Sequence, residues 1–415
     1  LPLTVRMPLD PLEVGEAEEL VQTVFGGSAS DELVEQIYER GGGNPLFLLQ
    51  LAELASDAPD STELPGSLRA LISARVDRLD PGPRAILDNA AVLGGTGPVA
   101  SLAAFAAHLG QQFSADELDT LEDFGLLEID DGWWHFRSDV VREVVYQTLT
   151  KTARAQRHAG TASVMIGRRS VGIDQIAHHA ATAAELVGEI GPVPGVSPQI
   201  KEQAVALLLE AVQKSLDSGA FANARRLATR ALDLFPPDPG DVRNLLLMRS
   251  EAAAERRDLP SARSDAQRAL DSSLRAGDLT DQAIALRLLG VIAQTEGDIP
   301  LARAEIERSI ELLRVAGNTT ELGTSLSDAG FVEVFGGSLG KADELLTEAE
   351  TLFIEIGDRR RRAWAVQHKA WVAFLSGDVS LARQRIEETL AVFEELGDEA
   401  GVSWCLGLMA YLHFM

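Results

Sequence analysis

The sequence contains little of what would build a disulfide-stabilised, membrane-embedded or sheet-rich protein. Cys405 is the only cysteine, so one chain forms neither a disulfide framework nor a cysteine zinc cluster. Aromatic residues make up 5%, whereas alanine and leucine dominate, and this composition favours helices over sheets. No apolar run reaches the roughly 18 residues of a membrane-spanning helix, and no signal-peptide pattern opens the chain. We therefore expect a mainly α-helical, cytoplasmic protein.

Positive charge is also scarce. The chain has 37 lysines and arginines against 63 acidic residues, which gives a net charge of −26. Such a field repels phosphate backbones and disfavours a general nucleic-acid-binding protein. The 415 residues, of which 46% are hydrophobic, exceed one ordinary domain and suffice for about two to four folded cores.

Signatures of catalysis are missing as well. The lookalike of a phosphate-binding P-loop, Gly336–Lys341, has the wrong glycine spacing. His178 and His179 are adjacent on a predicted helix and point to different faces, so they are a poor metal site. No serine-nucleophile elbow is present. The sequence predicts neither a catalytic site nor a metal site, and no cofactor bound by this chain alone.

The second half of the chain repeats every 40 residues. Gly-Asp or Gly-Asn pairs begin at Gly277, Gly317, Gly357 and Gly397. A second series lies between them, at Arg257, Gly297, Gly337 and Gly377, and a third consists of Ala262, Ala302, Ala342 and Ala382. Between these marks apolar residues recur at three- and four-residue spacing, and glycine permits a left-handed helix end. Each unit is therefore predicted to be helix–turn–helix.

The order of these marks resembles a long variant of the tetratricopeptide repeat (TPR) over residues 199–415. The resemblance implies an α-solenoid with a concave groove; a different helical solenoid is the alternative. The last helix carries apolar residues where a solenoid needs a polar cap, so the array looks truncated at its C-terminus.

The repeat register assigns aromatic residues to that groove. Two first-helix positions recur at 40-residue spacing, one in Phe331, Trp371 and Tyr411 and the other in Trp364 and Trp404. By resemblance to TPR proteins both positions face the concave surface, where Arg287 and Gln367 would add polar contacts. An aromatic ladder of this kind can hold a protein, a peptide or a small molecule. The alternative is ordinary packing between neighbouring repeats.

The most specific motif of the first half is the run Gly41-Gly42-Gly43-Asn44-Pro45, followed by Leu-Phe. The glycines end one helix, and Asn-Pro begins another. The run resembles the G-N-P-L-F motif of STAND ATPases, AAA-type switch proteins that include LuxR-type regulators and modules fused to nucleotidyl cyclases. The resemblance implies that residues 1–60 are a helical lid remnant and that Asn44 and Pro45 contact the nucleotide base. The alternative is a simple helix corner.

A segment of helices with one β-hairpin follows. Alternating residues flank Asp131-Gly132, a pair suited to a type I′ turn. Helices followed by a hairpin predict a winged-helix domain over residues 61–150. A winged helix can bind DNA, and residues 137–169 are locally basic, but the family resemblance favours an internal regulatory role.

The segment that ends this domain resembles the F-R-H-D block of STAND proteins, whose His-Asp pair faces the nucleotide. Here Ser138 and Asp139 occupy these positions. They are candidate nucleotide contacts by resemblance, although a hydroxyl cannot carry the charge of an imidazole. Ser138 can alternatively cap the next helix. Residues 151–198 are predicted to be linker helices that lead into the repeats.

The sequence thus predicts the regulatory part of a bacterial STAND signal-transduction ATPase. The resemblance implies that a protein, peptide or small-molecule ligand binds the TPR groove and thereby controls an upstream nucleotide-binding core. That core would use ATP or ADP with magnesium and drive an adenylate cyclase or LuxR-type transcriptional effector. Neither membrane association nor direct nucleic-acid contact is expected. Two alternatives stay open, a stand-alone TPR adaptor and a DNA-binding regulator acting through the winged helix.

Overall fold

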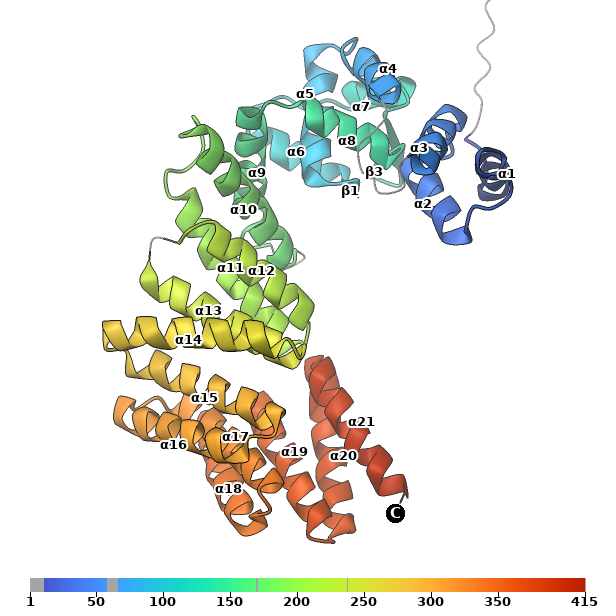
Figure 1. Cartoon of the computed structure of the whole chain (residues 1–415). Coiled ribbons are helices and arrows are strands. Elements are labelled where there is room, and N and C mark those ends of the chain that lie inside the picture. Colours follow the sequence, from blue (N-terminus) through green and yellow to red (C-terminus); the bar gives the residue numbers. More distant parts are fainter. Residues whose placement is uncertain (1–10, 58–65, 169–170, 237, 415) are drawn as a thin grey trace, which may run out of the picture. The chain divides into compact units, whose positions relative to one another are not determined.

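The computed structural model describes residues 11–57, 66–168, 171–236 and 238–414 (Figure 1). These residues form 21 α-helices and three short strands, which confirms a mainly α-helical protein. The chain divides into two compact units, here called unit 1 (Leu1–Val171 and Thr182–Ile200) and unit 2 (Gly172–Ala181 and Lys201–Met415). Within the described ranges, no helix is both long enough and apolar enough to cross a membrane.

Unit 1 begins with three helices, α1 (Val14–Phe25), α2 (Asp31–Gly41) and α3 (Pro45–Asp57). Gly42 ends α2 in the left-handed conformation, with φ of 60°. The side-chain oxygen of Asn44 then accepts hydrogen bonds from the backbone N–H groups of Leu46 and Phe47, at 3.1 and 3.4 Å. This caps α3, which starts with Pro45, so the predicted helix break and restart are confirmed.

A small antiparallel sheet and five helices follow. The helices are α4 (Gly66–Val76), α5 (Pro81–Leu93), α6 (Val99–His108), α7 (Ala115–Asp123) and α8 (Asp139–Thr148). The predicted hairpin is confirmed, because β2 (Leu127–Asp130) pairs with β3 (Trp133–Phe136). Asp131 and Gly132 at its tip have φ of 44° and 78°, the left-handed pair of a type I′ turn.

The sheet has a third strand that the sequence did not predict. β1 (Thr96–Pro98) pairs with the other edge of β3, and the strand order is β1-β3-β2. Gly97 lies opposite Trp134, whose ring is fully buried. A Cβ atom at Gly97 would lie 3.1 Å from that ring, so glycine makes room for the largest side chain of the core. One cluster of buried side chains runs continuously from Ala17 to Val145, so α1–α3 share the core of the sheet and its helices.

Two helices follow this core, α9 (Lys151–Met165) and α10 (Ile173–Ile190). Residues 173–181 of α10 belong to unit 2, and residues 182–190 belong to unit 1.

Unit 2 is a succession of helices that pack side by side in chain order, from α11 to the red α21 (Figure 1). Its helices are α11 (Ile200–Asp217), α12 (Phe221–Asp233), α13 (Pro239–Glu255), α14 (Leu259–Ala276), α15 (Leu279–Glu296), α16 (Ile299–Ala316), α17 (Thr319–Phe335), α18 (Leu339–Glu355), α19 (Arg359–Leu375), α20 (Val379–Leu396) and α21 (Glu399–Phe414). The helices α13, α15, α17, α19 and α21 start at residues 239, 279, 319, 359 and 399. This regular succession of helix pairs is a TPR-like α-solenoid.

The Gly-Asp and Gly-Asn pairs of the repeat are helix caps. The glycines close helices in the left-handed conformation, as at Gly277, Gly297, Gly317 and Gly397, with φ between 68° and 88°. The side chain that follows accepts a hydrogen bond from a backbone N–H at the start of the next helix, as in Asp278, Asp298, Asn318, Asp358, Asp378 and Asp398. Each pair therefore ends one helix and begins another.

The two ends of the solenoid meet within unit 2. The guanidinium of Arg360, in α19, lies 3.5 Å from the carboxylate of Asp217, at the end of α11. A Cβ atom at Gly219 would lie 3.0 Å from the backbone nitrogen of Ala400, at the start of α21.

Arg257 occupies the place of the cap glycine in one repeat, with φ of 62°. Replacing it by glycine should raise the free energy of unfolding by about 0.5–1 kcal/mol, since a left-handed L-residue costs roughly 1–2 kcal/mol and the greater freedom of unfolded glycine offsets part of this. Urea unfolding of the full chain measures the change. Gly297→Arg at the equivalent position is the matched control and should destabilise by a similar amount; a loss of stability in Arg257→Gly would contradict the prediction.

Candidate functional site

A cavity of about 720 Å³ lies among the helices α11, α13, α15, α17, α19 and α21 of unit 2 and is here called the groove. Its lining residues follow the repeat, and one position recurs in Ile284, Thr324, Trp364 and Trp404. A second position recurs in Val291 and Phe331. The volume is within the range of about 300–1,000 Å³ that is usual for ligand pockets.

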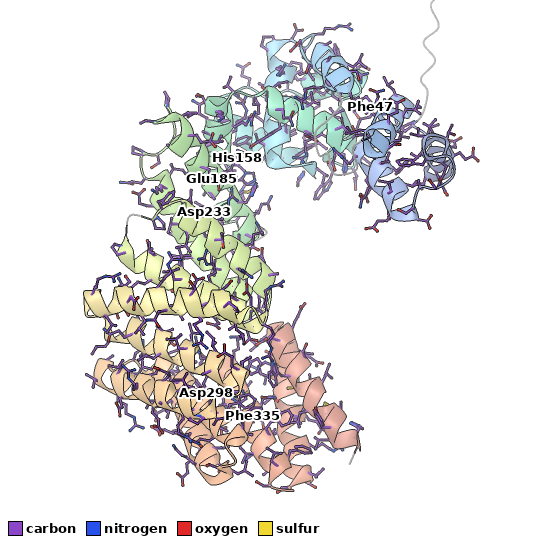
Figure 2. All side chains as sticks on the ribbon, in the orientation of Figure 1. Phe47, His158, Glu185, Asp233, Asp298 and Phe335 are labelled. Atoms are coloured by element: carbon purple, nitrogen blue, oxygen red, sulfur yellow. The ribbon has the colours of Figure 1, made fainter. Side chains whose placement is uncertain are left out.

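Aromatic side chains form one wall of the groove. Phe331 stacks on His368, with ring centroids 4.2 Å apart and planes 15° apart, and meets the edge of Trp404 at 5.7 Å. Trp364 lies 6.0 Å from His368. Phe335, labelled in Figure 2, adds a ring that is 60% exposed at the end of α17. The wall therefore combines residues from three successive repeats.

Arg287 is the buried cation of the groove. Its side chain is 10% exposed and donates a hydrogen bond to the carboxylate of Asp328 at 2.9 Å. Burial alone would lower the pKa of Arg287, but Asp328, Glu251 and Glu321 outweigh burial and raise that pKa. The Nε atom of Arg287 is buried and has no hydrogen-bond partner among the described residues. One donor of this guanidinium is therefore left without an acceptor inside the described part of the protein.

Three carboxylates of the groove, those of Glu251, Glu255 and Glu321, form no ion pair within the part of the chain that the structure describes. Glu251 and Glu255 lie one turn apart on α13, and burial raises the pKa of both. The pKa of Glu255 rises to about 7, because the protein groups around the carboxylate and the charge of Glu251 both disfavour ionisation. The residue itself is still exposed to solvent at the edge of the groove. The groove lining therefore holds more carboxylates than cations, and the charge of Glu251 is offset by Arg287 and Arg360 without a direct ion pair.

His368 adds no positive charge to the groove. Burial lowers its pKa to about 4, so the ring is neutral at pH 7, and its Nδ1 lies 3.2 Å from the hydroxyl of Ser327.

The groove contains four of the predicted ligand contacts, namely Arg287, Phe331, Trp364 and Trp404. The other three lie outside its lining. Gln367 is fully buried, and neither amide atom has a hydrogen-bond partner among the described residues. Trp371 and Tyr411 contact each other, with ring centroids 5.9 Å apart. In α19 the lining extends from Arg360 to His368, so it ends before the turn that carries Trp371.

Sequence analysis missed Glu251, Glu255, Glu321, Asp328 and His368. The repeat register contains a signal for two of them, because Asp328 and His368 occupy one position 40 residues apart and line the groove together. The unpaired state of the glutamates has no local sequence signal.

In unit 1 the two segments that carry the STAND resemblance lie against each other. A Cβ atom at Gly42 would lie 2.0 Å from the backbone oxygen of Arg137 and 3.0 Å from the Cβ of Ser138. Arg40 and Glu143 approach within 3.8 Å beside this contact. The run that contains Asn44 and the run that contains Ser138 are thus neighbours in space.

The four candidate nucleotide contacts have different surroundings. Ser138 is buried, and its hydroxyl accepts a hydrogen bond from the N–H of Val141 at 3.3 Å, so it caps α8. Asp139 is exposed and lies 3.7 Å from Arg142. Pro45 is exposed at the start of α3, whereas the side chain of Asn44 is occupied as a cap.

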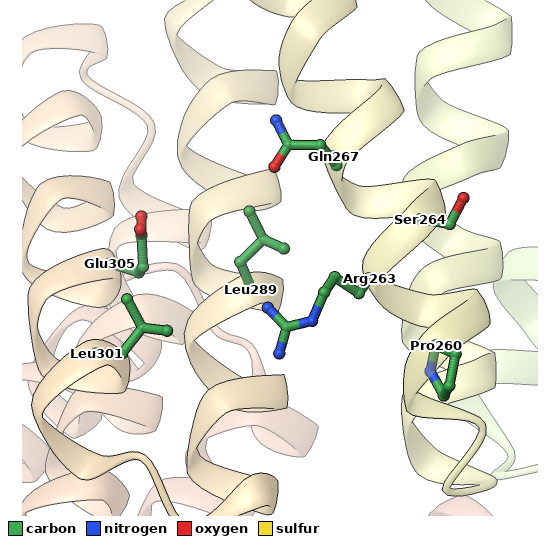
Figure 3. A pocket seen from close by; sticks show the side chains of 7 residues that line it. All are labelled: Pro260, Arg263, Ser264, Gln267, Leu289, Leu301 and Glu305. Atoms are coloured by element: carbon green, nitrogen blue, oxygen red, sulfur yellow. The ribbon is translucent and has the colours of Figure 1, made fainter.

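A second hollow, of about 500 Å³, lies among α14, α15 and α16 (Figure 3). Pro260, Arg263, Ser264, Gln267, Leu289, Leu301 and Glu305 line it. Its lining includes no aromatic ring and no buried charged side chain, so the groove is the stronger candidate site. Across the described ranges, no cluster of three or more histidine, cysteine or acidic side chains is arranged to hold a metal ion.

No protein-family model matches this sequence, and comparison with curated proteins finds no match. One similar solved structure is a STAND protein with a tetratricopeptide repeat sensor from Pyrococcus horikoshii, at 14% identity and a TM-score of 0.39, covering 94% of this chain and 61% of that one. Another is aspartyl phosphate phosphatase F from Bacillus subtilis, at 11% identity and a TM-score of 0.41, covering 99% and 97%. This chain therefore spans 61% of the length of the Pyrococcus horikoshii protein. All these scores lie below 0.5, so no function is carried over from either protein.

Proposed function

We propose that this chain is the regulatory region of a STAND signalling ATPase, and that a ligand or partner bound in the groove controls a nucleotide-binding core elsewhere in the protein. The groove carries this proposal. Arg287 lies buried in it beside Asp328, and the carboxylates of Glu251 and Glu255 form no ion pair with other described residues. A ligand can supply the partners that these carboxylates lack.

The arrangement of unit 1 supports the same proposal. Residues 1–60 act as a lid remnant and residues 61–150 as a winged-helix domain, and the contact of Gly42 with Arg137 joins these two parts. Residues 151–198 link them to a TPR array of 40-residue repeats. Pro45 and Asp139, both exposed, are available to the nucleotide of an upstream core that uses ATP or ADP with magnesium. The output is a nucleotidyl cyclase or a LuxR-type transcriptional domain.

Nucleotide release from the intact protein tests this coupling. Trp404→Ala removes part of the groove wall and should change the release rate of fluorescent ADP about fivefold or more, the lower end of usual allosteric coupling. Phe235→Ala is the control, because Phe235 is 80% exposed in unit 2 and lies outside the groove lining. Equal release rates in both variants and the parent protein would contradict the proposal. An intact protein that binds no nucleotide would leave a stand-alone TPR adaptor.

A further inference from the structure

The charges that line the groove are not balanced within the groove. Three of its four arginines are paired with carboxylates, since Arg287 binds Asp328, Arg360 binds Asp398, and Arg361 binds Asp358. The fourth, Arg257, stands at the exposed rim. The same lining contains three glutamates that form no ion pair with described residues, namely Glu251, Glu255 and Glu321. The groove therefore attracts a positively charged group.

The aromatic wall favours an organic cation over a metal ion. Faces and edges of Phe331, Trp364 and Trp404 lie in the same cavity as the glutamates. Aromatic rings attract ammonium and guanidinium groups through their negative faces. The glutamates lack the close arrangement that would hold a metal ion, since no described cluster meets that requirement.

Other polar groups of the groove suit a peptide backbone. The side-chain amides of Asn244 and Gln294 line the groove and form no side-chain hydrogen bond with other described residues. A peptide backbone carries the carbonyl and N–H groups that these side chains need, whereas a simple amine does not.

We propose that the groove binds a peptide segment with a lysine or arginine side chain, whose charged group lies against Glu251 and Glu255 beside the aromatic wall. Backbone carbonyl and N–H groups of the same segment form hydrogen bonds with the side-chain amides of Asn244 and Gln294. The inference rests on the proposed function of the groove as a ligand site and names the ligand class.

Pools of fluorescein-labelled hexapeptides test this assignment on the full chain. Each pool fixes lysine, arginine, norleucine or glutamate at one central position and randomises the others. The lysine and arginine pools should bind about tenfold more tightly than the norleucine and glutamate pools, which corresponds to about 1.4 kcal/mol. Equal binding of all four pools, or no binding of any, would overturn the proposal.

Charge-removing variants locate the binding position. The double variant Glu251→Gln, Glu255→Gln should lose about tenfold in affinity for the lysine pool while keeping its fold by circular dichroism. The matched control is Glu311→Gln with Glu387→Gln, two exposed glutamates on α16 and α20 that lie outside the groove lining. An equal loss in both double variants would mean that only the overall charge of the chain matters, and the assigned position would be wrong.

Two further readouts separate the alternatives. Affinity for the lysine pool should rise as the pH rises through about 7, because Glu255 then ionises among the charges of Glu251, Asp328, Asp398 and Arg257. If lysinamide displaced the labelled pool at the same concentration as an unlabelled peptide does, a simple amine would suffice for binding. That result would overturn the peptide assignment. Selective peptide binding without any effect on nucleotide release would instead overturn the proposed coupling while the ligand class stands.

Discussion

Asp398→Ala should lower the free energy of unfolding of unit 2 by about 3 kcal/mol, the lower end of the usual cost of breaking a buried ion pair. Asp398 is fully buried. One oxygen accepts hydrogen bonds from Arg360 Nε at 2.8 Å and from Trp364 Nε1 at 3.2 Å, and the other caps α21 through the N–H of Gly401 at 3.0 Å. Alanine leaves all three donors without this acceptor. Urea unfolding followed by tryptophan fluorescence measures the loss.

Asp378→Ala is the matched control for this substitution. Asp378 caps α20 in the same way, through the N–H of Leu381 at 3.0 Å, but it is exposed. Loss of such a cap costs about 1 kcal/mol. If both variants lost the same stability, the bonds of Asp398 to Arg360 and Trp364 would contribute nothing beyond the cap.

Gly42→Ala should destabilise unit 1 by about 3 kcal/mol. The left-handed conformation costs an L-residue about 1–2 kcal/mol, and overpacking against the Arg137 carbonyl adds about 1–3 kcal/mol. A Cβ atom at position 42 would lie 2.0 Å from that backbone oxygen. A backbone atom cannot move aside as the end of a flexible side chain can. Thermal unfolding followed by circular dichroism measures the change.

Gly26→Ala separates the two causes. Gly26 ends α1 with the same φ of 60°, but no atom lies within 4 Å of an added Cβ. It should cost about 1 kcal/mol, the conformational part alone. Equal losses at Gly26 and Gly42 would show that the segments around Gly42 and Arg137 can move apart freely, and the support that this contact gives to the proposed function would fall.

The features that sequence analysis predicted correctly depend on local chemistry. Glycine caps and aspartate caps act within a few residues, so pairs such as Gly277-Asp278 reveal helix ends without knowledge of the fold. The turn at Asp131-Gly132 is local in the same sense. Strand β1 differs, because Thr96–Pro98 contains a glycine and a proline that disfavour strands. It becomes a strand through its pairing with β3 and the space that Gly97 leaves for Trp134.

The groove was predictable only in part for a related reason. The repeat register tells which residues share a position, and Phe331 and Trp404, which it assigned to the groove, line the cavity. It does not tell how far the cavity extends along the solenoid, so Trp371 was assigned to the groove although the lining ends one turn before it. The importance of Glu251 and Glu255 depends on the absence of a partner in space, which no spacing of residues encodes.

The contact between the two ends of unit 2 changes how a repeat array is expected to unfold. In a linear array each repeat contacts only its neighbours, so terminal repeats fray first. Here Asp217 and Arg360, more than a hundred residues apart in sequence, close the array on itself. Opening either end then also breaks contacts of the other end, such as that of Gly219 with Ala400. These contacts link α11 to α19 and α21, so the two ends of the array are expected to unfold together rather than independently.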